Sequence, residues 1–230
     1  MSEGAGDPPV SKSRINRVGA RLRKAAVAGE GLLDTDLDTL DVFRRWHRPT
    51  LELVHAHVLD AFRDAALPIT GRPLKTQQAI VAKLVRSRTR LSTMQDIAGT
   101  RITVPDLETQ RAAADRVLEL FADCDAKVDR DTVERADSYG YRAIHVVAKL
   151  EGRHAEIQIR TQAQDAWAQL VEDLDRAMRS DLKHGQGPSD WLEWLILLSD
   201  ALRKRDLGHP VALPPNPYDQ VLERPEGSDE

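Results

Sequence analysis

Residues 142–160 read RAIHVVAKLEGRHAEIQIR, and this stretch decides the fold. Two runs rich in β-branched residues lie on either side of Gly152, which predicts two strands joined by a tight hairpin turn. Because side chains alternate along a strand, Glu156, Gln158 and Arg160 share one face and the intervening isoleucines share the other. An antiparallel sheet with one solvated face gives the same alternation, so this pattern leaves a structural and a functional interpretation open.

The segments outside the hairpin also carry the periodicity of regular structure. Strands are predicted at 99–104, 127–131, 142–150 and 154–160. Helices are predicted at 13–28, 36–66, 76–85, 107–121, 162–179 and 189–205, the first with Ser13 as N-cap and the second interrupted by Pro49. This order predicts an α+β fold, a small mixed β-sheet flanked by helices, with helical extensions at both ends. The sequence has neither a Rossmann nor a Walker phosphate loop.

The composition is typical of a soluble globular protein. Of the 230 residues, 41% are hydrophobic and 30% are charged, and the net charge is −4, so any basic binding site must be local. The single cysteine, Cys124, rules out an internal disulfide and fits a reducing compartment. No apolar run reaches membrane-spanning length, and residues 1–9 lack the blocks of a signal peptide. We therefore expect a cytoplasmic location without membrane association.

Charged residues that suit phosphate chemistry precede the hairpin. Asp96 lies just before a predicted strand and, with Glu156, would supply carboxylate oxygens to one Mg²⁺, although a turn cap explains an aspartate here equally well. Lys75 and Lys83 are spaced to share one helical face, where they could neutralise a triphosphate. An ordinary solvated helix face is the alternative interpretation.

Gly140 and Tyr141 precede the first hairpin strand. The glycine gives the backbone freedom to turn the aromatic ring outward, where it could stack on a base, although a tyrosine at the start of a strand is more often packed. His145 lies on the same strand and could reach a phosphate or a hydroxyl, but a lone histidine is more often structural.

Four motifs together resemble the synthetase domain of the RelA/SpoT-type alarmone synthetases. They are Lys75-x7-Lys83, Asp96-Ile-Ala-Gly-Thr-Arg101, Gly140-Tyr-Arg-Ala-Ile-His145 and Glu156-Ile-Gln-Ile-Arg-Thr161. They occur in the family's order and spacing, between Arg72 and Arg160. The resemblance implies a sheet of the nucleotidyltransferase-like synthetase type and a small enzyme that carries the synthetase without a hydrolase domain.

The resemblance also implies an activity. The chain would move the β,γ-pyrophosphate of ATP to the ribose 3′-hydroxyl of GDP or GTP and so make (p)ppGpp. Asp96 and Glu156 would bind Mg²⁺, and Glu156 would also assist deprotonation of the attacking hydroxyl. ATP would be bound by Arg72, Lys75, Lys83 and Arg101. The acceptor nucleotide would be bound by Arg130, Tyr141, His145 and Gln158, with Tyr141 stacked on the guanine.

Composition, helical periodicity and the resemblance together predict five parts of the chain. They are a disordered N-terminus (1–12), N-terminal helices (13–66), a RelA/SpoT-like synthetase core (67–180), a C-terminal helix (181–208) and a flexible tail (209–230). Small relatives are often homotetramers, so a dimer or tetramer is expected. The apolar surface around Trp191 and Trp194 is one candidate interface, although it could equally pack on its own core.

Several positions depart from the family pattern. Ala79 stands where a serine is usual, Asp137 where a basic residue is common, and Arg72 is one position away from the usual arginine. These departures leave two alternative functions open. One is a toxin-type relative that makes (p)ppApp or pyrophosphorylates the 3′ end of tRNA, with the basic helix face Arg14–Lys24 as an RNA contact. The other is a catalytically degenerate nucleotide-binding regulator.

Overall fold

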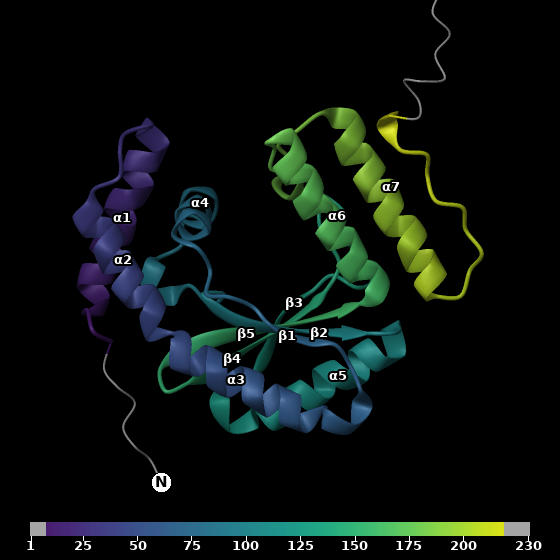
Figure 1. The fold of residues 1–230 in the computed structure, drawn as a ribbon, viewed down its shortest axis with the longest axis horizontal. Helices are drawn as coiled ribbons and strands as arrows, with labels where there is room; N and C mark the ends of the chain where they lie inside the picture. The colour runs from purple at the N-terminus through teal and green to yellow at the C-terminus, as the bar shows by residue number, and fades with distance from the viewer. Residues whose placement is uncertain (1–7, 219–230) are drawn as a thin grey trace, which may run out of the picture. The chain divides into compact units, whose positions relative to one another are not determined.

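The computed structural model describes residues 8–218. It confirms the α+β fold: a five-stranded mixed sheet has helices packed around it, and its strand order is β1-β2-β5-β4-β3 (Figure 1). The strands are β1 (Ile69–Gly71), β2 (Ala98–Val104), β3 (Lys127–Asp131), β4 (Ile144–Leu150) and β5 (Arg153–Thr161). The short edge strand β1 was not predicted. It pairs antiparallel with β2, with Thr70 opposite Arg101.

Seven helices lie in the described residues. They are α1 (Lys12–Ala28), α2 (Asp34–Trp46), α3 (Arg48–Ala61), α4 (Gln77–Ser87), α5 (Leu107–Leu120), α6 (Gln162–Met178) and α7 (Ser189–Asp206). Short 3₁₀ turns occur at Arg63–Ala65, Leu91–Thr93, Ala122–Cys124 and Leu182–His184. The N-cap of α1 is Ser11 rather than Ser13, because the Ser11 hydroxyl accepts from the N–H of Arg14. The predicted helix 36–66 is two helices separated at His47, with Pro49 in the first turn of α3.

The hairpin is formed by β4 and β5. Glu151 and Gly152 both have positive φ, 49° and 79°, the conformation that a tight two-residue turn between right-twisted strands requires. The solvated-face interpretation of β5 is wrong, because Glu156, Gln158 and Arg160 are only 9%, 6% and 4% exposed. Charged and amide groups buried this deeply need partners inside the protein, and those partners form the site described below.

The chain divides into two compact units, and strands β2 to β5 contribute residues to both. In the described residues, the first unit comprises 8–102, 115–129 and 145–158. In it, α1 packs against α2 and α4. Its largest apolar cluster contains Ile15, Val18, Leu22, Leu40, Phe43, Ile80, Val81, Leu84, Leu91, Met94 and Ile97.

The second unit comprises residues 103–114 and 130–144 and the described residues from 159 to 218. In it, α6 and α7 lie side by side (Figure 1), and the Trp167 indole N–H donates to the carbonyl of Leu195 (2.9 Å). Part of the segment expected to be a flexible tail runs back along α7, where the Trp194 indole N–H donates to the carbonyl of Pro214 (3.1 Å). The proposed interface around Trp191 and Trp194 therefore contacts the chain's own tail. Within residues 8–218, no helix combines the length and apolar character that crossing a membrane requires.

Candidate active site

Asp96 lies just before β2 and is held between two lysines of the first unit. The Nζ atoms of Lys75 and Lys83 are 3.1 Å and 2.8 Å from the same oxygen, Asp96 Oδ2. The backbone N–H of Lys75 donates to the carbonyl of Ile97, which fixes this residue beside the start of β2. Only Lys83 lies in α4, so the prediction that the two lysines share one helical face is wrong: they meet at Asp96 from two different segments. Burial raises the pKa of Asp96, as does Glu156, but the two lysines outweigh both and hold the pKa below its ordinary value. Asp96 is therefore ionised at neutral pH.

Glu156 lies within β5, and three side chains surround its carboxylate. His145 Nδ1 is 2.7 Å from Oε1, Gln158 Nε2 donates to Oε2 at 2.6 Å, and a guanidinium nitrogen of Arg72 is 3.8 Å from Oε2. Burial raises the pKa of Glu156, but the His145 hydrogen bond and charge, with help from Gln158 and Arg72, lower it to about 2. An ionised carboxylate only accepts hydrogen bonds, so His145 Nδ1 carries the hydrogen and donates it.

Gly99 allows β2 to approach Glu156 closely. A Cβ atom at position 99 would lie 2.7 Å from the Glu156 carbonyl oxygen and 3.8 Å from its Cβ, so this side of β2 faces Glu156. Side chains alternate along a strand, so the half-buried Arg101 lies on the same side. Glu156 also repels Asp96 enough to push its pKa upward. The structure therefore brings both carboxylates, far apart in the sequence, into one electrostatic environment.

The residues present fit a magnesium ion. Asp96 Oδ1 is buried and makes no hydrogen bond, which leaves one carboxylate oxygen available to a cation. Mg²⁺ is usually held by one or two carboxylates together with substrate phosphates and waters. In the part of the chain that the structure describes, no group of three or more His, Cys, Asp and Glu side chains could hold a metal. Two carboxylates beside lysine and arginine side chains suit an ion that arrives with a phosphate ligand.

Tyr141 and Arg130 come together in the second unit. The Arg130 guanidinium lies over the Tyr141 ring, 5.3 Å from its centroid, and it forms an ion pair with Asp137 (2.7 Å). Asp137 Oδ1 in turn accepts the backbone N–H of Tyr141 (2.9 Å). The acidic residue that departs from the family pattern thus fixes the tyrosine backbone and neutralises the neighbouring arginine.

Sequence reasoning did not single out Arg160 as a site residue. Its guanidinium lies over the Tyr141 ring, 5.1 Å from the centroid, and donates to the tyrosine hydroxyl (3.0 Å) and to Asp165 (3.1 Å). Burial lowers the pKa of Arg160, but Tyr141 and Asp165 outweigh it and raise the pKa, so the guanidinium stays charged. Strand alternation, which places position 160 on the face of Glu156 and Gln158, was the signal that could have identified it.

Residues 71–175 match the model of a family described as a region found in RelA / SpoT proteins. This span contains both carboxylates, the two lysines and the tyrosine with its arginines. Residues 71–175 form a RelA/SpoT synthetase domain.

Of two curated relatives of the chain, one is named as uncharacterized and the other is named as an enzyme. "Uncharacterized protein Rv1366" of Mycobacterium tuberculosis (strain ATCC 25618 / H37Rv) is 28% identical over 79% of this chain, and the chain spans 64% of that relative's length. "GTP pyrophosphokinase YwaC" of Bacillus subtilis (strain 168) is 27% identical over 64% of this chain and 72% of its own length.

Solved structures of small alarmone synthetases share the fold. Small alarmone synthetase 1 of Bacillus subtilis superposes with a TM-score of 0.59 at 24% identity, over 70% of this chain and 89% of the other. The same enzyme bound to its product pppGpp gives 0.56 at 25% identity, over 70% and 90%.

Ala79, which replaces the usual serine of the RelA/SpoT domain, lies in the first turn of α4. Its backbone N–H donates to the Thr76 hydroxyl (3.2 Å), which caps the helix. The departure therefore removes one side-chain hydroxyl but leaves the N-terminus of α4 capped.

Proposed function

We propose that the RelA/SpoT domain transfers the β,γ-pyrophosphate of ATP to the ribose 3′-hydroxyl of GDP or GTP and so makes (p)ppGpp. The observation that carries the proposal is the pair of ionised carboxylates enclosed by cationic and hydrogen-bonding side chains. Asp96 lies between Lys75 and Lys83, and Glu156 is bonded by His145 and Gln158 beside Arg72. A buried arrangement of this kind suits a transfer in which negative charge must be neutralised and aligned.

The donor half of the site would bind the ATP phosphates. Asp96 and Glu156 would hold Mg²⁺, which when bound neutralises phosphate charge and orients the pyrophosphoryl group. The Nζ atoms of Lys75 and Lys83 both contact Asp96 Oδ2, and each can exchange this contact for one with a phosphate oxygen. Arg101, on the side of β2 that faces Glu156, would stack on the adenine.

The acceptor 3′-oxygen would attack the β-phosphorus of ATP. The bond from that phosphorus to the α,β-bridging oxygen then breaks, AMP leaves, and the acceptor carries the pyrophosphate. With a pKa of about 2, Glu156 is a weak base, so its role would be to orient the hydroxyl by accepting its hydrogen bond and to take the proton only as the new bond forms. Tyr141, with Arg130, would stack on the guanine.

Two relatives support a guanosine acceptor. The Bacillus subtilis relative YwaC is named a GTP pyrophosphokinase, and small alarmone synthetase 1 is solved with its product pppGpp. The decisive experiment incubates the protein with Mg²⁺, ATP labelled at the β- or γ-phosphate, and GDP, GTP, ATP or tRNA in separate reactions. Label on GDP or GTP supports the proposal. If no acceptor gains label while the protein binds nucleotide, the catalytically degenerate regulator is favoured instead.

An RNA 3′ end is a second candidate acceptor, supported by a basic hollow in the first unit. The hollow has a volume of about 340 Å³ and lies between α1 and the turn after α4, where it is lined by Arg23, Arg88 and Arg90. A neighbouring hollow adds Lys24. Such cations suit a phosphate backbone. Label on tRNA that is lost in Arg23→Glu, with GDP unlabelled, would support this acceptor over guanosine nucleotides.

A further inference from the structure

Helix α7 contacts the backbone directly beside Tyr141. Gly140 has a positive φ of 95°, and a Cβ atom there would lie 3.1 Å from the Leu195 carbonyl oxygen and 3.3 Å from Ile196 Cα. The Ser199 hydroxyl donates to the Gly140 carbonyl at 2.5 Å. The residue before Tyr141 is therefore held against α7 by a close approach that only glycine permits and by a short hydrogen bond.

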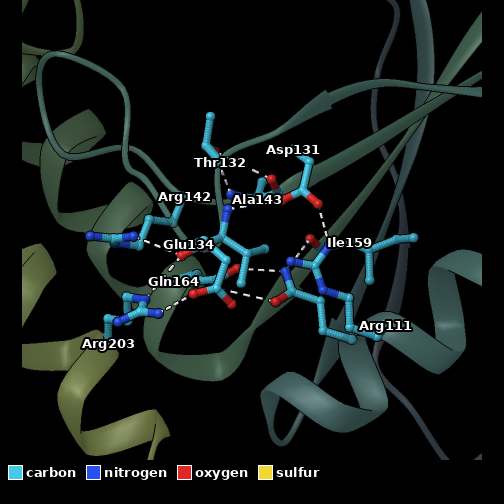
Figure 2. Close-up of polar contacts among 11 residues, drawn as sticks. Arg111, Asp131, Thr132, Glu134, Arg142, Ala143, Ile159, Gln164 and Arg203 are labelled. Carbon is cyan, nitrogen blue, oxygen red and sulfur yellow. Dashed lines mark hydrogen bonds and ion pairs between the residues drawn. The ribbon is translucent and has the colours of Figure 1, made fainter.

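The residue after Tyr141 is bound to the same helix. Arg142 is only 7% exposed, and its guanidinium donates to the Ser199 hydroxyl (3.2 Å) and to Asp200 (2.6 Å). Its third bond, to the Val133 carbonyl (2.7 Å), reaches the loop before Tyr141. Arg203 of α7 contacts the same loop, because it donates to Val133 and pairs with Glu134 (Figure 2).

These contacts hold the backbone on both sides of Tyr141 before any ligand arrives. A base stacks well only on a ring that is already in place, since ordering it on binding would cost conformational entropy. Charge-assisted hydrogen bonds from a buried arginine are among the stronger constraints that a protein can provide. Ser199 and Asp200 make these bonds within the second unit, whereas Lys75 and Lys83 pair with Asp96 within the first.

We propose that α7, through Ser199 and Asp200, positions Tyr141 for the acceptor base and so sets acceptor affinity without affecting ATP. The inference rests on the proposed function, because it takes Tyr141 as the residue on which the acceptor stacks. Ser199 and Asp200 are positioning residues, since they act through Gly140 and Arg142.

The test compares Ser199→Ala and Asp200→Ala with Leu197→Ala, a matched control on an exposed part of the same helix. Steady-state transfer is measured with GDP varied at saturating ATP, and then with ATP varied at saturating GDP. Loss of one charge-assisted bond is expected to raise the KM for GDP about tenfold, with the KM for ATP unchanged. The Asp200 side chain is 53% exposed, so Asp200→Ala folds even if the Ser199 variant does not. Asp200→Asn keeps an acceptor for Arg142 and is expected to restore most of the affinity.

A second readout needs no turnover. The Tyr141 amide is bonded to Asp137 Oδ1, so its hydrogen–deuterium exchange reports how firmly the loop is held. We expect faster exchange at residues 137–142 in Ser199→Ala and Asp200→Ala than in Leu197→Ala, and weaker GDP binding by calorimetry. Equal exchange in all three variants, or KM values for GDP and ATP that rise together, would overturn the inference. Failure of the wild-type protein to label any acceptor would instead remove the proposed function. The hydrogen–deuterium exchange rates and the GDP affinities of the three variants would still decide the inference about α7.

Discussion

Acidification should destabilise this protein through His47, which lies buried between α2 and α3. Burial lowers the pKa of His47 to about 4 from an ordinary value of 6.5, because its ring is packed edge-on against Phe43 and Trp46 and cannot readily accept a charge. The neutral form is favoured in the folded state, so the stability it provides is complete above pH 6.5 and is lost as the pH falls toward 4. At pH 5 the unfolded chain has bound this proton and the folded chain has not, which costs about 2 kcal/mol relative to pH 7.5.

The assay is urea unfolding followed by circular dichroism at pH 7.5 and pH 5, on the wild type and on His47→Gln. Glutamine is neutral at both values and keeps an N–H donor for the Phe43 carbonyl, which His47 Nδ1 contacts at 3.0 Å. His154 also has a pKa lowered by burial, and comparing the two proteins at each pH cancels the part of its contribution that does not act through His47. We expect the wild type to lose about 2 kcal/mol more than the variant between the two pH values. An equal loss in both proteins would refute the assignment.

Three further predictions concern the candidate site. Glu156→Gln should lower the transfer rate about 100-fold or more while ATP binding, measured by calorimetry, persists; unchanged turnover would remove Glu156 from the mechanism. Tyr141→Ala should weaken acceptor binding by about 1–3 kcal/mol, seen as a raised acceptor KM, whereas Tyr141→Phe keeps the ring and most of the affinity; an equal effect of both would argue against stacking. Gly99→Ala should cost about 1–3 kcal/mol in urea unfolding because its methyl group meets the Glu156 carbonyl, and Gly31→Ala, with no atom within 4 Å, should be neutral; matching losses would contradict the close approach.

Much of the fold could be predicted because the hairpin strands are runs rich in β-branched residues on either side of a turn signal. The hairpin around Gly152 and the strand at Lys127–Asp131 were both predicted, and both are present. The edge strand Ile69–Gly71 was missed because three residues carry no measurable periodicity, and only pairing with β2 defines it.

The candidate site was predicted less completely than the fold. Motif order indicated Asp96 and Glu156, and the structure brings them into one electrostatic environment, although their roles stay predictions. Local pattern could not reveal that Asp137 would pair with Arg130 or that Arg160 would contact the Tyr141 hydroxyl. Such contacts depend on where strands and loops meet in space, and that information is not local in the sequence.

The segment that runs back along α7 bears on how the protein can be handled. Pro214 accepts from the Trp194 indole, and Tyr218 lies edge-on against Trp191 with ring centroids 5.1 Å apart. Gly208, two residues after the end of α7, is the position at which the sequence pattern would suggest shortening the chain. Truncation at this position would expose the indole rings of Trp191 and Trp194, and we expect it to lower the solubility of the protein before it lowers the activity.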